Sequence, residues 1–338
     1  MPILKTSRGA LESISLAMSI RPDDSPRRLL EHLEAEVVGQ TDLLLGLIVA
    51  LLADGHVLLE GVPGLAKTRA VRVLAQALDL RFQRVPFTPD LLPADLTGTQ
   101  IYRPSTGEFE TRVGPIFTNL LLADEINRAP AKVQSALLEA MQERQVTLGE
   151  QTRPLPEPFL VLATQNPIEH EGTYPLPEAQ LDRFLLKLIV KYPSRTAERA
   201  LLDLPSVVDE DRPPPTPPAW NAADLKTLRA HARAVHVAPP IKDYILDVAR
   251  ATRSPAEYGL DLAPLIELGV SPRATISLLR AARAWALIQQ RDYVTPADVK
   301  RLAPDVFRHR LIPSFEAEAE GIDADSLLQR ILDHVPIP

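Results

Sequence analysis

The sequence predicts an α/β domain followed by a helical domain. Before residue 209, short apolar runs typical of strands alternate with segments whose apolar residues recur at helical spacing. Residues 209–220, DEDRPPPTPPAW, are dense in proline, which cannot continue a helix or a central strand, so they are typical of a stiff surface linker. After this linker the patterns are helical throughout, as in LKTLRAHARAV, IKDYILDVARAT, ATISLLRAARAWALI and DSLLQRILDHV.

Composition limits the class of protein. A chain of 338 residues exceeds the usual size of a single core, and 45% apolar with 24% charged residues is typical of a globular protein. No apolar tract approaches the length of a membrane span. The absence of cysteine excludes disulfides and thiolate metal sites, which fits the cytoplasm, where we expect the protein. Acidic residues outnumber basic ones 44 to 37, which argues against nucleic acid as a general partner.

The first predicted strand and helix are joined by the loop GVPGLAKT, residues 61–68. The apolar run 56–60 ends at this loop, and residues 68–80 place their apolar side chains on one helical stripe. In this setting, backbone N–H groups and a helix N-terminus can hold a phosphate anion. Pro63 and Gly64 supply a tight turn in which Gly64 is free to take a positive φ. A plain strand–turn–helix connection is the alternative.

Ala66 departs from the general phosphate-loop pattern, which has glycine at this position. We expect residue 66 to lie where the helix begins. Because a helical residue does not need glycine, the alanine should keep the N–H that a phosphate oxygen would use. Lys67 would bring its ammonium to the β and γ phosphates of a nucleotide, and the Thr68 hydroxyl would bind Mg²⁺.

A second predicted strand, LLLADE at 120–125, ends in two adjacent carboxylates. A nucleotide hydrolase with a phosphate-binding loop needs one carboxylate to hold Mg²⁺ and another to orient the attacking water. Asp124 is the candidate metal-side acid and Glu125 the candidate general base. Taken alone, the run would favour a buried strand whose polar end reaches solvent. Its combination with the loop 61–68 favours the catalytic interpretation.

A third predicted strand, FLVLAT at 159–164, is followed by Gln165, Asn166 and Pro167. If it lies beside the first two strands in a parallel sheet, Asn166 reaches the crevice at their carboxyl ends, where such sheets bind ligands. A polar side chain there can fix a water molecule or contact a γ-phosphate. The alternative is an Asn-Pro turn that only ends the strand.

Two arginines are further candidates for phosphate contact. Arg183 precedes the run FLLKLIV, which we predict to be another strand, and Arg273 stands at the start of a helix in the second domain. A planar guanidinium that is always charged suits a γ-phosphate. Residue type alone, however, favours a local Asp182–Arg183 ion pair and a solvated helix end.

Together these motifs resemble the MoxR family of AAA+ ATPases. The resemblance is carried, in order, by GVPGLAKT, NLLLADEINRAP, LATQNP, EGTYPLPEAQLDRF and SPRA, and it runs from Val37-Val38-Gly39-Gln40 to DYVTPADVKRLAPDVFRHRL, nearly the whole chain. The family commonly has alanine at the position of Ala66. The resemblance implies a P-loop core, a parallel five-stranded αβα sandwich with β-hairpin inserts, followed by a helical lid. We therefore divide the chain into an N-terminal helical segment 1–35, an ATPase core 36–193, a proline-rich linker 194–220 and a lid 221–338.

The resemblance also implies residue roles. Lys67 and Thr68 become Walker A residues, Asp124 and Glu125 become Walker B residues, Asn166 becomes sensor 1 and Arg273 becomes sensor 2. Arg183 becomes the finger that acts on a neighbouring subunit's nucleotide. ATP is expected against Gly39, Gln40, Gly61, Val62, Pro63, Gly64, Leu65, Ala66, Lys67, Thr68 and Asp124, with Mg²⁺ held by Thr68 and Asp124.

Two segments are predicted β-hairpins. Residues 100–113 turn at Pro104–Gly107, and residues 145–154 turn at Gly149-Glu150. They match the helix-2 insert and pre-sensor-1 hairpin of this AAA+ clade, and they could contact client proteins or be structural only.

The family's function implies Mg²⁺-dependent ATP hydrolysis by a homo-oligomeric ring, usually a hexamer. Hydrolysis would remodel or activate partner proteins, often ones with von Willebrand factor A domains. The alternatives are a related AAA+ motor for nucleic acid or metal chelation, and a nucleotide-gated scaffold with little turnover.

Overall fold

The structure is a computed structural model that describes residues 26–105, 107–167, 172–202 and 220–338. Residues 32–222 form one compact unit, the core unit, and residues 223–338, with residues 26–31, form a second, the helical unit. Most of the predicted N-terminal segment, residues 1–25, and most of the proline-rich linker, residues 203–219, lie outside the described residues. The domain limits drawn from the sequence at 35, 193 and 220 stay predictions.

A five-stranded parallel sheet forms the centre of the core unit, as the resemblance implied. Its strands lie in the order β2-β5-β8-β1-β9. Four of the five strands coincide with apolar runs that were predicted to be strands, whereas β2 was not predicted. The bounds are Val57–Glu60 for β1, Phe82–Pro86 for β2, Leu120–Asp124 for β5, Leu160–Gln165 for β8 and Leu186–Ile189 for β9.

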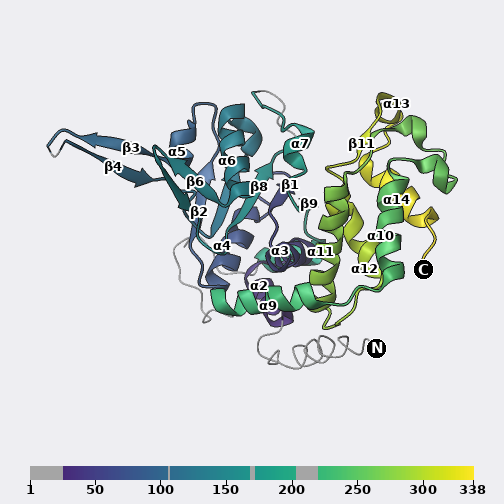
Figure 1. Cartoon of the computed structure of the whole chain (residues 1–338). Helices are drawn as coiled ribbons and strands as arrows, with labels where there is room; N and C mark the ends of the chain where they lie inside the picture. The colour runs from purple at the N-terminus through teal and green to yellow at the C-terminus, as the bar shows by residue number, and fades with distance from the viewer. Residues whose placement is uncertain (1–25, 106, 168–171, 203–219) are drawn as a thin grey trace, which may run out of the picture. The chain divides into compact units, whose positions relative to one another are not determined.

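Helices cover the sheet (Figure 1), and most apolar side chains of β1, β5 and β8 are buried. Alternate residues of a strand face opposite sides, so Leu121 and Ala123 of β5 join a core cluster with Leu137 of α6 (Ala131–Glu143). Helix α3 (Thr41–Leu52) packs on β9, and α4 (Lys67–Ala77) packs on β5. Because all five strands run the same way, their carboxyl ends meet at one edge of the sheet.

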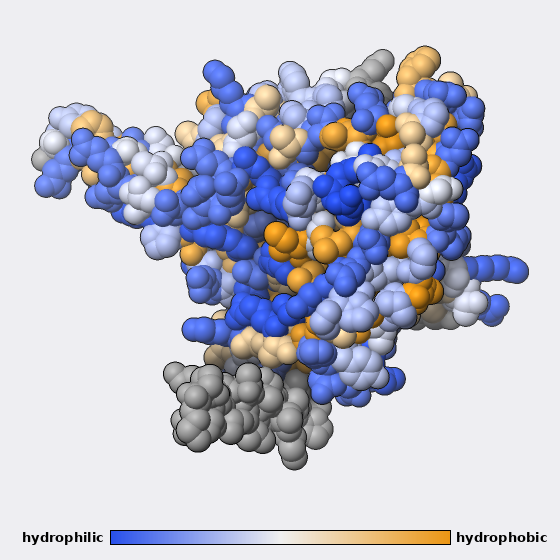
Figure 2. Space-filling view, turned by 45° about the vertical axis from the view of Figure 1, so that its right-hand side comes forward, coloured by the Kyte–Doolittle hydropathy of each residue, from blue (hydrophilic) through white to orange (hydrophobic). Residues whose placement is uncertain are grey.

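Both predicted hairpins are present in the core unit. Strand β3 (Gly98–Arg103) pairs with β4 (Glu108–Val113), and β6 (Gln145–Leu148) pairs with β7 (Gln151–Pro154), both antiparallel. The β3–β4 hairpin projects away from the sheet (Figure 1). Its surface mixes hydrophilic and hydrophobic side chains (Figure 2), and the aromatic rings of Tyr102 and Phe109 lie against each other with centroids 5.3 Å apart.

Short helices complete the core unit. They are α2 (Pro26–Glu36), which begins in the helical unit's range, α5 (Pro93–Thr97), the 3₁₀ helix η2 (Ile126–Arg128), α7 (Glu178–Leu181) and α8 (Arg195–Leu202). Helix α8 occupies the first part of the segment expected to be linker. The chain is described again from Trp220, which is buried and whose N–H donates to the Ala77 carbonyl. This contact anchors the end of the linker on the core unit.

The helical unit confirms the four predicted helices and adds elements that the sequence had not indicated. The predicted helices are α9 (Ala222–Ala234), α10 (Pro239–Ala251), α11 (Pro272–Ile288) and α14 (Ala324–His334). Helix α11 packs on α10 and α12 (Pro296–Phe307). The prediction of helix throughout is wrong in one place, because β10 (Ile266–Leu268) and β11 (Ile312–Pro313) pair as an antiparallel ribbon. The remaining elements are η3 (Pro255–Tyr258), η4 (Ala263–Leu265) and α13 (Phe315–Ala319).

Among the described helices, none combines the length and the apolar character that a membrane span requires.

The loop between β1 and α4 corrects the argument made for Ala66. Gly64 has a positive φ of 85°, as predicted. Ala66, however, is not helical: it caps α4 with φ 58° and ψ 20°, in the left-handed region that favours glycine. The expectation that position 66 does not need glycine was therefore wrong in its physical reason. The alanine is accommodated at a conformational cost of about 1–2 kcal/mol.

We predict that Ala66→Gly stabilises the core unit. Glycine removes the left-handed penalty but gains freedom in the unfolded chain, so the net gain in unfolding free energy should be about 0.5–1 kcal/mol. Urea unfolding followed by circular dichroism would measure it. The matched control is Ala136→Gly, because Ala136 is also half-buried but lies inside α6, where glycine should destabilise by about 1 kcal/mol. Equal destabilisation by both changes would contradict the left-handed assignment.

Candidate nucleotide site

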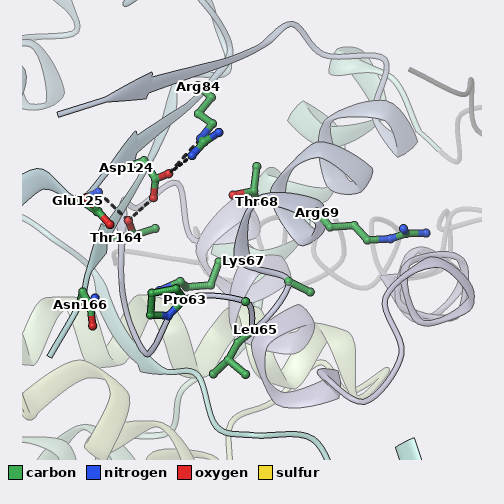
Figure 3. Close-up of a pocket in the computed structure, with 12 residues that line it drawn as sticks. Pro63, Leu65, Lys67, Thr68, Arg69, Arg84, Asp124, Glu125, Thr164 and Asn166 are labelled. Atoms are coloured by element: carbon green, nitrogen blue, oxygen red, sulfur yellow. Dashed lines mark hydrogen bonds and ion pairs between the residues drawn. The ribbon is translucent and has the colours of Figure 1, made fainter. Parts of the chain in front are cut away.

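A pocket of about 380 Å³ lies at the carboxyl edge of the sheet (Figure 3). It is bounded by the β1–α4 loop and by the ends of β5 and β8, three segments that are distant in sequence. Volumes of this size are typical of small-molecule sites. The lining residues are Pro63, Gly64, Leu65, Ala66, Lys67, Thr68, Arg69, Arg84, Asp124, Glu125, Thr164 and Asn166.

Lys67 lies in the first turn of α4, and its ammonium donates a hydrogen bond to the Gly61 carbonyl of the same loop. Burial lowers the pKa of Lys67 below its ordinary value, and the nearby carboxylates of Asp124 and Glu125 oppose that shift. The first backbone N–H of α4 that donates within the helical turn is that of Ala70, and its acceptor is the Ala66 carbonyl. Helix geometry thus leaves the preceding N–H groups without an acceptor inside the helix, at the same end as the ammonium.

Asp124 ends β5, and each of its oxygens accepts hydrogen bonds from a neighbouring strand. Oδ1 accepts from the Thr164 hydroxyl of β8 at 2.6 Å. Oδ2 accepts from Arg84 of β2, from Nε at 3.0 Å and from a terminal nitrogen at 2.6 Å. Figure 3 shows these contacts on both sides of the carboxylate. The central acid of the pocket is therefore held by two strands at once.

Glu125 follows Asp124 in an unusual backbone conformation. Its φ of 55° and ψ of 52° lie in the left-handed region, and its N–H donates to the Thr164 hydroxyl oxygen at 2.8 Å. Its carboxylate lies 3.2 Å from the guanidinium of Arg128. Two non-glycine residues that line this pocket, Ala66 and Glu125, thus hold left-handed conformations. Such strain is concentrated at functional sites, where the surrounding structure fixes it.

Asn166 lies directly after β8 and is 8% exposed. Strand β8 pairs with β5 on one side and β1 on the other, as the prediction for Asn166 required. The structure thus brings Lys67, Thr68 and Asn166 into one pocket with the two acids.

Sequence reasoning missed Arg69, Arg84 and Thr164. Thr164 stood in the quoted strand, two residues before Asn166. Nothing in the sequence analysis singled out Arg84, because β2 was not predicted as a strand. Arg69 extends away from the acids (Figure 3) and donates to Glu36.

Other predicted residues do not line the pocket in the described structure. Gly61 and Val62 are outside the lining, and a Cβ on Gly61 would approach the Val190 carbonyl oxygen to 2.8 Å. The absence of a side chain at Gly61 therefore lets the β1–α4 loop pack closely against the chain at the end of β9. The Gln40 amide donates to the Lys191 carbonyl at 3.2 Å, and a Cβ on Gly39 would approach Ala197 Cβ to 2.6 Å and Pro193 Cβ to 2.9 Å.

The two predicted arginines are also elsewhere. A terminal nitrogen of Arg183 donates to the Leu138 carbonyl of α6 at 2.8 Å, and Arg183 does not line the pocket. Arg273 is exposed in the first turn of α11, in the helical unit. The roles of both arginines stay predictions.

The residues that line the pocket fit a nucleotide bound together with Mg²⁺. Backbone N–H groups at a helix N-terminus and a lysine ammonium suit phosphate oxygens. The Thr68 hydroxyl and the Asp124 carboxylate are oxygen donors of the kind that Mg²⁺ prefers, and Mg²⁺ is commonly held by one or two such groups together with substrate phosphates. Lys67, whose ammonium contacts a backbone oxygen here, could exchange that acceptor for phosphate.

Comparison with known proteins agrees with this geometry. Residues 56–186 match the model of the ATPase family associated with various cellular activities (AAA). Residues 261–331 match the model of the AAA lid domain. The first match contains the β1–α4 loop and the ends of β5 and β8, and the second contains Arg273.

Similar proteins match most of the chain. The chaperone MoxR1 of Mycobacterium tuberculosis is 49% identical over 92% of this chain and 82% of its own length. The uncharacterised protein YeaC of Bacillus subtilis is 47% identical over 92% and 94%. The crystal structure of a proposed ATPase from Cytophaga hutchinsonii superposes with a TM-score of 0.87 at 45% identity, over 98% of each chain. With the fold and the pocket described above, these matches show that the chain belongs to the MoxR family of AAA+ ATPases.

Proposed function

We propose that the chain hydrolyses ATP with Mg²⁺ and uses the reaction to remodel or activate partner proteins. The observation that supports this most strongly is the pocket itself, which gathers Lys67, Thr68, Asp124, Glu125 and Asn166 at the edge of the sheet. A cation, a hydroxyl, two acids and an amide are groups of the kind that nucleotide hydrolases with a phosphate-binding loop use for phosphoryl transfer to water. The name of the chaperone relative supports the remodelling half of the proposal.

Each group in the pocket has a chemical task in this proposal. The N–H groups at the start of α4 and the ammonium of Lys67 would bind the phosphates. Thr68 and Asp124 would hold the Mg²⁺ that accompanies the nucleotide. Bound Mg²⁺ would neutralise the charge that develops on the phosphate oxygens. Glu125 would orient the attacking water and accept its proton, and Asn166 would fix that water or contact the γ-phosphate. For Glu125 this means leaving its present partner, Arg128.

We further propose that the active unit is a ring, of six subunits by family resemblance. Arg183 is directed at the Leu138 carbonyl rather than into the pocket of its own chain. That placement suits a residue whose phosphate belongs to a neighbouring subunit. Arg273 would reach nucleotide from the lid as sensor 2. We place the ring in the cytoplasm.

The projecting hairpin β3–β4 is the segment that we propose for client contact. Phe109 is 67% exposed and Tyr102 is 52% exposed, and the two rings pack on each other at the outer part of the hairpin. Exposed aromatic side chains are enriched in protein interfaces. Proteins with von Willebrand factor A domains are the first clients to test, because they are frequent partners in the family.

The first experiment tests nucleotide binding. Lys67→Ala removes charge-assisted hydrogen bonds to phosphate, so ATP affinity should fall at least about tenfold while the protein stays folded. Calorimetric titration with ATP measures this. Lys132→Ala, which removes an exposed lysine from α6, is the matched control and should bind normally. Unchanged binding by the Lys67 variant would refute the phosphate site.

The second experiment separates binding from chemistry. Glu125→Gln removes the base but keeps Asp124 and Lys67, so ATP should bind with near-normal affinity and be hydrolysed very slowly. Phosphate release measures turnover. Wild-type turnover in this variant would exclude Glu125 as the base. If wild-type protein itself binds ATP without turnover, the nucleotide-gated scaffold would be the correct alternative. The ATP-bound Glu125→Gln protein is also the natural bait for clients.

The third experiment tests the shared site. Arg183→Ala should bind ATP almost normally yet lose most of its hydrolysis, because such fingers contribute roughly a thousandfold or more. Mixing it with Lys67→Ala subunits should restore activity, since complete sites form where an intact loop meets an intact finger. Fluorescence transfer between labelled chains must show that subunits exchange. Exchange without rescue would mean that Arg183 acts in its own chain or not at all.

A further inference from the structure

Arg84 is a cation in the pocket that the proposed mechanism does not use. It comes from β2, the edge strand beyond β5, and both of its contacting nitrogens bond to one oxygen of Asp124. Arg84 pairs in register with Leu122, so its side chain lies on the same face of the sheet as Asp124. The neighbouring Val85 faces the opposite side and joins the apolar cluster. Strand alternation thus aims this arginine at the acid expected to hold Mg²⁺.

The two partners of Asp124 differ in how easily they can leave. Thr164 is 2% exposed, and its hydroxyl is fixed twice, by donating to Oδ1 of Asp124 and by accepting the Glu125 N–H. The Arg84 side chain is 53% exposed and belongs to an edge strand. Partner exchange at Oδ1 would disturb the backbone of Glu125 as well. At Oδ2 it requires only the rotation of a long, half-exposed side chain.

We propose that Arg84 is a positioning residue that occupies Oδ2 of Asp124 in the nucleotide-free protein and competes there with Mg²⁺. This inference rests on the proposed magnesium-dependent nucleotide site. The guanidinium neutralises Asp124 and keeps its carboxylate aimed into the pocket while no metal is bound. When Asp124 takes up its role toward the metal, Arg84 releases Oδ2. Because Arg84 also lines the pocket, its charge then stays beside the phosphates.

Competition gives opposite effects with and without the metal. Without Mg²⁺, Arg84 adds positive charge to a pocket that must receive a phosphate chain, so it favours nucleotide binding. As Mg²⁺ is added, the same arginine must be displaced from Asp124, so it raises the metal concentration needed. If Arg84 only linked β2 to β5, its replacement in a folded protein would change neither the nucleotide affinity without Mg²⁺ nor the Mg²⁺ concentration needed for binding.

The experiment measures the affinity for a fluorescent, non-hydrolysable ATP analogue at a series of free Mg²⁺ concentrations. Arg84→Ala should weaken binding in EDTA roughly two- to fivefold and lower the half-saturating Mg²⁺ concentration by a similar factor. Arg84→Lys keeps the charge but not the two-pronged contact. In EDTA, the Arg84→Lys protein should therefore bind the ATP analogue with near wild-type affinity. It should lower the half-saturating Mg²⁺ concentration less than Arg84→Ala does.

Controls make the outcomes distinct. Arg103→Ala removes a comparably exposed arginine that pairs with Glu110 in the hairpin, and it should change neither quantity. Thermal unfolding checks that each variant is folded. An unchanged or increased Mg²⁺ requirement in folded Arg84→Ala overturns the competition, whatever happens to the affinity in EDTA, and leaves the proposed function intact. If wild-type protein binds the analogue no better than Lys67→Ala, the proposed function fails and the role of Arg84 fails with it.

Discussion

The hydrogen bonds of the Thr164 hydroxyl are the constraint on which the arrangement of the pocket depends. One hydroxyl donates to the carboxylate of Asp124 and accepts the N–H of Glu125, so a single side chain of β8 fixes the carboxylate at the end of β5 and the backbone of the residue that follows. This is possible only because β5 and β8 are adjacent and parallel, with Ala123 opposite Ala163. The left-handed backbone of Glu125 is held by the same contact.

The acids and the lysine of the pocket are partnered within the protein. Asp124 pairs with Arg84, Glu125 pairs with Arg128, and the ammonium of Lys67 donates to a backbone carbonyl. Burial of these charged groups without partners would be costly, so the internal contacts stabilise this arrangement of the pocket. Binding of an anionic nucleotide with its metal is then an exchange of partners. The nucleotide affinity should reflect the difference between two sets of contacts. The internal contacts that break are therefore as important as the contacts that form with nucleotide and metal.

The sequence allowed much of the fold and of the pocket to be predicted, because each motif is local. The strand runs, the loop 61–68, the two acids and Asn166 are all readable along the chain, and the parallel sheet then brings them together. Arg84 and Thr164 could not be found in this way, since their importance depends on which strands are neighbours. The conformation of Ala66 was mistaken because residue type alone did not show that the helix begins one residue later. The β10–β11 ribbon joins segments more than 40 residues apart and has no local signal.

The most direct test of the central claim is a crystal structure of the chain with Mg²⁺ and a non-hydrolysable ATP analogue. The account predicts phosphate oxygens within hydrogen-bonding distance of the N–H groups at the start of α4, and the ammonium of Lys67 moved from the Gly61 carbonyl to phosphate. It also predicts that Arg84 has released Asp124 while the Thr164 contacts persist. A nucleotide bound elsewhere, or a Lys67 that still donates only to Gly61, would contradict the assignment of this pocket.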